Sequence, residues 1–244
     1  MEEYISKLLD KMPDDMEDMA NTPGPNHLFN VNKGRAILFH HIVAKLLYLH
    51  RRAQQDIQMV LEFLCTRARN LDKDNYKKLM RVIQYFRDTQ KMTLISEPSD
   101  NPQWWVDCSY YIHPDMKSHI GIFKSIGKGR TYKSSCKQKL NTKSPTKAKL
   151  VAIDEAMAQI LSTIIFLAAQ VIPVPVTMIN QDNKSTSLLL YHGRMSSSKF
   201  NKHLNVQYIF VMDRIKQGEV KVTYCPNENM LADFLIRPLQ GMAY

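Results

Sequence analysis

Three aspartates in the second half of the chain stand where oxygen ligands for a metal ion could converge. Asp107 lies in a strand-like stretch, Asp182 follows another such stretch, and Asp233 lies in an apolar segment near the end of the chain. Carboxylates at strand ends and on a packed helix can meet around a hard cation, which takes oxygen ligands. Two such cations can align an attacking water with a leaving oxygen during phosphodiester cleavage. Each aspartate alone is more typical of a helix cap or a surface charge, but their joint placement predicts metal-dependent chemistry.

The elements that would position these aspartates alternate between strands and helices. Strands are expected at residues 103–111, 121–126, 130–133, 177–180 and 219–225, with a hairpin turn at 127–129. Helices are expected at 146–170, 204–216 and 229–235. This order predicts an α/β fold with a mixed five-stranded sheet that carries helices on its faces.

The chain before this α/β region has a different pattern. Residues 1–35 are acidic and contain a turn-forming stretch at 21–26. Residues 36–95 repeat apolar side chains at helical spacing. Residues 97–102, which include two prolines, are expected to be a linker.

Positive charge is concentrated in the α/β region. Residues 102–244 carry 18 Lys and Arg against 9 Asp and Glu, whereas residues 1–101 carry 15 against 14. Between Lys117 and Lys149 there are ten basic residues and no acidic one. Such a surface suits a polyanion such as nucleic acid. A lysine-rich solvated face is the alternative, because charge by itself names no partner.

The sequence gives no sign of a membrane or secretory protein. The 244 residues are 44% hydrophobic, enough for a core, yet they contain no uninterrupted run of 18 apolar residues. The acidic N-terminus lacks a signal-peptide pattern, and the four cysteines are far apart. We expect an intracellular protein, cytoplasmic or nuclear, without a transmembrane segment, a zinc site or disulfides.

Several short motifs resemble one family. Residues 106–110, 134–139, 191–194, 202–208 and 230–239 are similar to the ribonuclease H domain of copia-type retroelements. Residues 39–48 and 81–89 resemble the helical, thumb-like region that lies between polymerase and nuclease in these polyproteins. The resemblance covers essentially the whole chain and implies a palm-derived tail at 1–35, a thumb-like or connection-like segment at 36–98 and a ribonuclease H-like domain at 102–244.

The resemblance implies cleavage of the RNA strand of an RNA–DNA hybrid with two Mg²⁺ or Mn²⁺ ions. The ligands would be Asp107, Asp182, Asp233 and a glutamate on the first long helix, where this chain has Lys149. A protonated lysine offers no lone pair, and at about 4 Å each unit of like charge costs about 4 kcal/mol at an effective dielectric of 20. We therefore expect metal binding to be weakened or lost and the chain to be a degenerate copy of an active nuclease.

Candidate contacts to nucleic acid come from the basic residues of the family-like stretches. They are Lys133, Lys137, Lys139 and His203. Capping or packing would explain His203 equally well.

Three functions remain open at this point. The first is a non-catalytic remnant that retains RNA–DNA hybrid binding. The second is an active ribonuclease H, in which the Lys149 ammonium takes the place of one of the two cations. The third is a domesticated module whose helical region binds a protein partner. Polymerase activity is excluded, because the chain has no aromatic-x-Asp-Asp turn and Asp14-Asp15 lies in an acidic stretch.

Overall fold

The computed structural model describes residues 37–52, 56–67, 73–89, 97–192 and 202–237. The chain divides into two compact units, with the boundary between Thr93 and Leu94. The expected tail at 1–35 lies outside the described residues.

The described residues of the first unit form three helices, as the apolar spacing predicts. They are α2 (Ile37–Arg52), α3 (Gln58–Thr66) and α4 (Lys73–Asp88). Their apolar faces form one core, in which Phe39, Phe63 and Phe86 are buried. Lys78 is also buried there, where it pairs with Asp74 one turn earlier, with 2.9 Å between Nζ and Oδ2.

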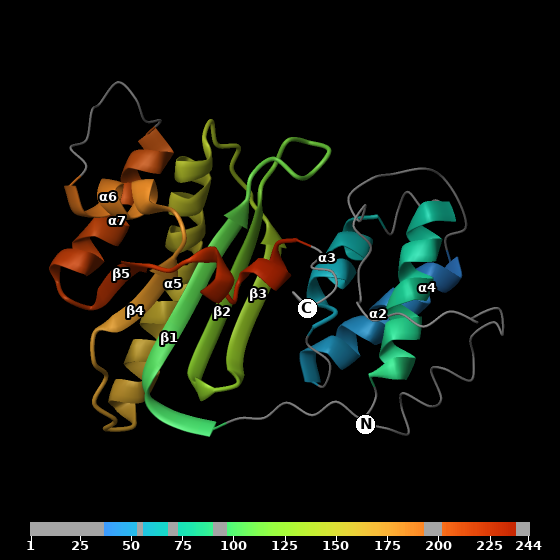
Figure 1. Ribbon diagram of the computed structural model, residues 1–244, viewed down its shortest axis with the longest axis horizontal. Helices are drawn as coiled ribbons and strands as arrows, with labels where there is room; N and C mark the ends of the chain where they lie inside the picture. The colour runs from blue at the N-terminus through green and yellow to red at the C-terminus, as the bar shows by residue number, and fades with distance from the viewer. Residues whose placement is uncertain (1–36, 53–55, 68–72, 90–96, 193–201, 238–244) are drawn as a thin grey trace. The chain divides into compact units, whose positions relative to one another are not determined.

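The second unit is built on a mixed sheet of five strands (Figure 1). The strands are β1 (Glu97–Ser109), β2 (His119–Lys128), β3 (Arg130–Lys137), β4 (Thr177–Gln181) and β5 (Val220–Tyr224). Their order in the sheet is β3-β2-β1-β4-β5. The pairs β1–β2 and β2–β3 are antiparallel, while β1–β4 and β4–β5 are parallel. The expected α/β fold class, with a mixed five-stranded sheet flanked by helices, is confirmed.

The long helix α5 (Pro145–Ala169) begins as its sequence predicts. Ser144 is the N-cap, with its Oγ accepting from the backbone N–H of Lys147 at 3.3 Å, and Pro145 occupies the first turn. Its first half supplies Leu150, Ile153 and Met157 to the core beneath β1 and β2. By length and composition alone α5 could cross a membrane, a test that a core helix of a soluble protein also passes.

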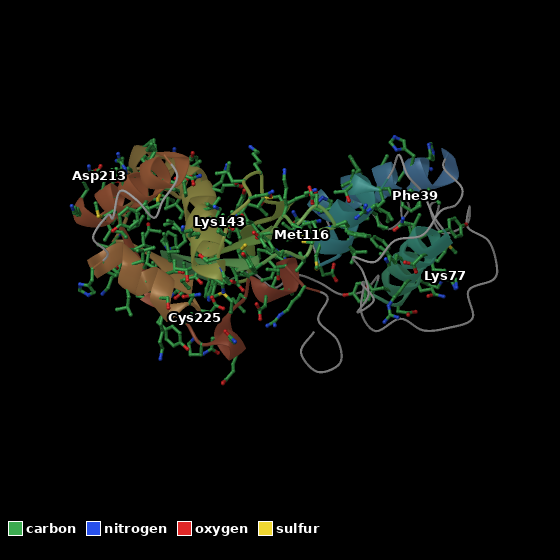
Figure 2. The ribbon with its side chains drawn as sticks, turned by 90° about the horizontal axis from the view of Figure 1, so that it is seen from above. Phe39, Lys77, Met116, Lys143, Asp213 and Cys225 are labelled. Carbon is green, nitrogen blue, oxygen red and sulfur yellow. The ribbon has the colours of Figure 1, made fainter. Side chains whose placement is uncertain are left out.

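The two faces of the sheet are covered differently, because side chains alternate along each strand. Trp104, Val106, Ile120 and Ile122 face the α5 core, which α7 (Lys202–Lys216) also joins. The opposite face carries Gly121, which lies against the short 3-10 turn η2 (Asp233–Leu235). Figure 2 shows Asp213 of α7 and Cys225, which follows β5, on opposite sides of this unit.

Two sequence-based expectations are wrong in detail, and one helix was not expected. The linker at 97–102 is the first part of β1, and its pairing with β2 shifts register between Glu97 and Pro102. Prolines are tolerated there because an irregular pairing does not require every backbone N–H. The final helix at 229–235 is instead two 3-10 turns, η1 (Asn227–Asn229) and η2. The helix α6 (Lys184–His192) was not expected, although Asn183 caps it by accepting from Thr186 N–H at 3.0 Å.

Gly121 permits the close contact between β2 and the turn that carries Asp233. A Cβ at this position would lie 2.6 Å from Ile236 Cγ2 and 2.8 Å from the backbone oxygen of Ala232. A backbone oxygen cannot rotate away, so a larger residue must displace the turn.

We expect Gly121→Ala to lower the free energy of unfolding by about 1–3 kcal/mol, the usual cost of overpacking. Urea titration followed by tryptophan fluorescence measures the change, because Trp105 packs against Met230 and Ala232 beside this turn. An unchanged midpoint would show that the turn is not seated against β2 as described.

Candidate functional site

The sheet and α5 bring the predicted site residues together from four separate segments. Asp107 lies in β1, Asp182 directly follows the neighbouring parallel strand β4, and Asp233 opens η2. Lys149 lies in the second turn of α5 and points into the same place. The convergence of these residues is a consequence of the strand order, which places β1 beside β4.

The ammonium of Lys149 is bonded to two of the three carboxylates. Its Nζ lies 2.6 Å from Asp107 Oδ1 and also donates to Asp182 Oδ1. The side chains of Lys149, Asp107 and Asp182 are 11%, 4% and 16% exposed, so these ion pairs are largely shielded from water. Asp107 Oδ1 also accepts from the backbone N–H of Cys108 at 2.7 Å.

Burial and the neighbouring charges set the protonation of this cluster. Burial alone would lower the pKa of Lys149, but the Asp107 carboxylate and then Asp182 outweigh it and raise that pKa above its usual 10.5. Burial raises the pKa of Asp107 above 3.8, opposed by Lys149 and assisted by a hydrogen bond with Asp233. Burial is the largest of these effects, and it explains why the pKa of Asp107 rises although this carboxyl group contacts an ammonium.

The donor set as it stands does not fit a divalent cation. Mg²⁺ and Mn²⁺ need oxygen ligands free to turn their lone pairs toward the metal. Here two of the oxygens already accept from Lys149, whose positive charge lies where the cation would be held. Among the residues that the structure describes, no three His, Cys, Asp or Glu side chains form a group that could hold a metal ion.

The two acidic residues of α5 have neighbours other than the Asp107 cluster. Asp154 is hydrogen-bonded to Gln207 of α7, and Glu155 lies near the charge of Lys139. Burial raises the pKa of both carboxyl groups.

A chain of hydrogen bonds holds the turn that carries Asp233. Ser135 Oγ donates to the Leu235 carbonyl at 2.7 Å, and His119 Nε2 lies 2.8 Å from Ser135 Oγ. His113 Nε2 lies 3.0 Å from His119 Nδ1. Because the hydroxyl hydrogen of Ser135 is already used for the Leu235 carbonyl, His119 donates to Ser135 through Nε2, and a neutral His119 then has Nδ1 as an acceptor toward His113. Burial, with a smaller effect of His113, lowers the pKa of His119 to about 3.

The residues predicted to contact nucleic acid differ in their exposure and pairing. Lys139 is exposed and Lys133 is partly exposed on β3. Lys137 is paired with Asp115, with 2.5 Å between Nζ and Oδ2, so its charge is largely compensated. The backbone of His203 belongs to α7, but its side chain lies outside what the structure describes.

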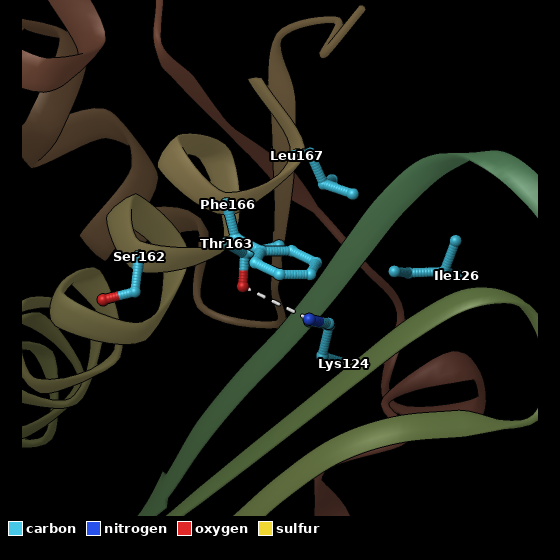
Figure 3. A pocket seen from close by; sticks show the side chains of 6 residues that line it. All are labelled: Lys124, Ile126, Ser162, Thr163, Phe166 and Leu167. Carbon is cyan, nitrogen blue, oxygen red and sulfur yellow. Dashed lines mark hydrogen bonds between the residues drawn. The ribbon is translucent and has the colours of Figure 1, made fainter. Parts of the chain in front are cut away.

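A pocket of about 260 Å³ lies elsewhere, between β2 and the last turns of α5 (Figure 3). Lys124 Nζ donates to Thr163 Oγ1 at 3.2 Å, and burial lowers the pKa of this lysine. Phe166 lines the pocket 17 residues after Lys149, which is about 25 Å along a helix. This pocket is therefore separate from the acidic cluster.

Sequence comparison relates the chain to a retroelement polyprotein. The chain is 26% identical over 186 residues to the "Retrovirus-related Pol polyprotein from transposon RE2" of Arabidopsis thaliana. The match covers 70% of this chain and only 12% of that polyprotein. No protein-family model matches the chain.

Structure comparison finds solved proteins with a similar fold. The foamy viral protease–reverse transcriptase in complex with RNA/DNA hybrid aligns with a TM-score of 0.50 and 12% identity, over 99% of this chain and 29% of that one. LC11-RNase H1, isolated from compost, aligns with a TM-score of 0.43 and 14% identity, over 56% of this chain and 93% of that one. At these identities the likeness concerns the fold.

We expect Lys149→Ala to destabilise the protein by about 3–5 kcal/mol, because it leaves buried carboxylates without their cation. Denaturant unfolding at pH 7 measures the loss. Lys143→Ala, which removes an exposed lysine just before α5, is the matched control and should change stability by less than about 0.5 kcal/mol. Equal stabilities of the two variants would contradict the buried ion pairs.

We also expect stability to fall in acid because of His119. Its folded-state pKa is about 3, below its ordinary 6.5, so its contribution is complete above pH 6.5 and is lost as pH falls toward 3. His119→Gln, which keeps a donor for Ser135 and cannot titrate, should make the decline between pH 6 and 4 shallower. His192→Gln replaces an exposed histidine and should leave the wild-type slope unchanged. A wild-type slope in His119→Gln would contradict this assignment.

Proposed function

We propose that this chain is a ribonuclease H-like module with impaired hydrolysis and retained binding of RNA–DNA hybrids. The proposal starts from its relationship to the C-terminal part of copia-type retrotransposon Pol polyproteins. The observation that carries the proposal is the position of Lys149 Nζ, bonded to both Asp107 and Asp182. The thumb-like character of residues 36–98 and the palm origin of residues 1–35 belong to the same proposal.

The loss of hydrolysis follows from competition for the carboxylate oxygens. A Mg²⁺ or Mn²⁺ ion that bound to Asp107 and Asp182 would have to displace the Lys149 ammonium and then remain close to it. Each unit of like charge at about 4 Å costs about 4 kcal/mol at an effective dielectric of 20. Lys149 cannot diffuse away as a free cation would, because it is part of α5 and largely buried. We infer that Mg²⁺ or Mn²⁺ binding is weakened or lost.

Retained binding is supported by charge rather than by the acidic cluster. The run from Lys117 to Lys149 has no acidic residue, and exposed lysines such as Lys139 and Lys143 are not part of the buried ion pairs. The foamy viral neighbour was solved in complex with RNA/DNA hybrid. Phosphate contacts of this kind weaken steeply as salt concentration rises.

The alternatives have less support. In an active enzyme, Lys149 would substitute for one cation beside a single Mg²⁺, but both oxygens that it contacts would have to serve the metal as well. A protein-interaction module would need an exposed apolar patch on the helical unit. Among the described residues of that unit, Tyr48 is the only exposed large hydrophobic side chain.

The decisive experiment restores the glutamate. We expect wild-type protein to cleave a labelled RNA–DNA hybrid at background rate in Mg²⁺, and Lys149→Glu to gain metal-dependent cleavage of at least about tenfold, the effect of a barrier lowered by about 1.4 kcal/mol. Lys147→Glu makes the same charge change two residues earlier and should gain nothing. Adding Asp107→Asn to Lys149→Glu should abolish the gain.

Two outcomes would overturn the proposal. Wild-type cleavage that Asp107→Asn removes would show that hydrolysis is not impaired. Hybrid binding that is absent, or unchanged between low and physiological salt in fluorescence anisotropy, would remove the binding function. If folded Lys149→Glu remains inactive, the assignment of position 149 as the lost ligand is wrong.

A further inference from the structure

The loop between β1 and β2, residues 110–118, exposes two large side chains, although interactions with neighbouring segments hold the loop in place. Tyr111 is 39% exposed and Met116 is 61% exposed, whereas His113 and Ser118 are buried. Met116 is labelled in Figure 2. The loop therefore combines buried polar residues with two large side chains that are open to solvent.

Three interactions fix the loop. Asp115 pairs with Lys137 of β3, and His113 Nε2 lies 3.0 Å from His119 Nδ1 of β2. Tyr111 donates its hydroxyl hydrogen to the Thr142 carbonyl, with 2.6 Å between the oxygens. The exposure of Tyr111 and Met116 is therefore a property of a held loop and not of a loose one.

The backbone at both residues is in the left-handed region. Tyr111 has φ 55° and Met116 has φ 57°, values that are uncommon for residues with bulky side chains. Such conformations cost of order 1–3 kcal/mol and occur preferentially at binding and catalytic sites. A glycine or asparagine would adopt them more readily.

Tyr110 and Tyr111 form an aromatic pair beside a cation. Their ring centroids are 3.9 Å apart with an interplanar angle of 16°, so Tyr110 supports one side of the Tyr111 ring. Thr142, which anchors Tyr111, precedes the exposed Lys143. Tyr111 is four residues after Asp107, which places their Cα atoms within about 14 Å.

We propose that the Tyr111 ring, backed by Tyr110, is a stacking platform for an unpaired nucleobase at the end of a bound hybrid. An exposed aromatic face beside basic residues is the chemistry that binds single-stranded nucleic acid, because bases stack on the ring while cations contact phosphates. The absence of acidic residues between Lys117 and Lys149 suits a polyanion at this place. This inference rests on the hybrid binding proposed above.

The test compares two RNA–DNA hybrids that differ only in a short single-stranded overhang. One overhang carries bases and the other carries abasic sites, so both have the same phosphates. Fluorescence anisotropy should give wild-type protein a dissociation constant roughly fivefold or more lower for the overhang with bases.

Three variants distinguish the effect of losing the Tyr111 ring from the effect of disturbing the fold. Tyr111→Asn tolerates the left-handed backbone but has no ring, and should remove the preference for bases. Tyr111→Phe keeps the ring without the hydroxyl and should retain most of it. Phe166→Ala removes an exposed aromatic ring at the far end of α5 and should bind as wild type does.

A second readout reports stacking directly. A 2-aminopurine in the overhang should lose fluorescence when wild-type protein binds, and should keep it with Tyr111→Asn. If wild-type protein binds the hybrid but shows no preference for bases, or if folded Tyr111→Asn keeps that preference, the platform is wrong. If wild-type protein binds neither hybrid, the proposed function itself fails.

Discussion

The Lys149 ammonium is the interaction on which the rest of this site depends. Asp107, Asp182 and Asp233 reach one buried place from β1, from the end of β4 and from η2. Carboxylates so close together repel one another and lose hydration, unless a cation or a proton offsets their charge. Lys149 supplies that cation through its two ion pairs with Asp107 and Asp182.

This arrangement makes the site independent of an external ion. The cation arrives with the main chain of α5, whose start is fixed by Ser144 and Pro145. Such a cation offsets the carboxylate charge at any metal concentration, but an ammonium cannot coordinate and activate a water molecule as a metal ion does. In the function proposed above, the residue that stabilises the carboxylates is therefore also the residue that impairs hydrolysis.

Much of this could be predicted from sequence, because alternation of strands and helices dictates a mixed sheet and places Asp107 near Asp182. The contacts that hold the segments around the site could not be predicted from the sequence. The pairing of Asp115 with Lys137 and the chain from His113 to Leu235 join segments that no local spacing relates. The turns at Asp233 were mistaken for a helix because seven residues with apolar spacing do not distinguish an α-helix from 3-10 turns. The left-handed backbone conformation of Tyr111 could not be predicted either, because the pattern of residue types does not indicate it.

The same pairings change how the basic run can be used. Of the ten basic residues from Lys117 to Lys149, Lys149 is held by carboxylates, Lys137 by Asp115, and Lys124 points to Thr163 and lies over the Trp104 ring. These pairings leave fewer of the ten to contact phosphates, and each phosphate contact that is lost reduces the slope of log K against log salt by about 0.9. When fewer charges are available to contact phosphates than the sequence suggests, contacts that salt does not screen contribute a larger share of the binding free energy. Stacking on an aromatic ring is such a contact, and the chain holds Tyr111 exposed beside the same basic segment.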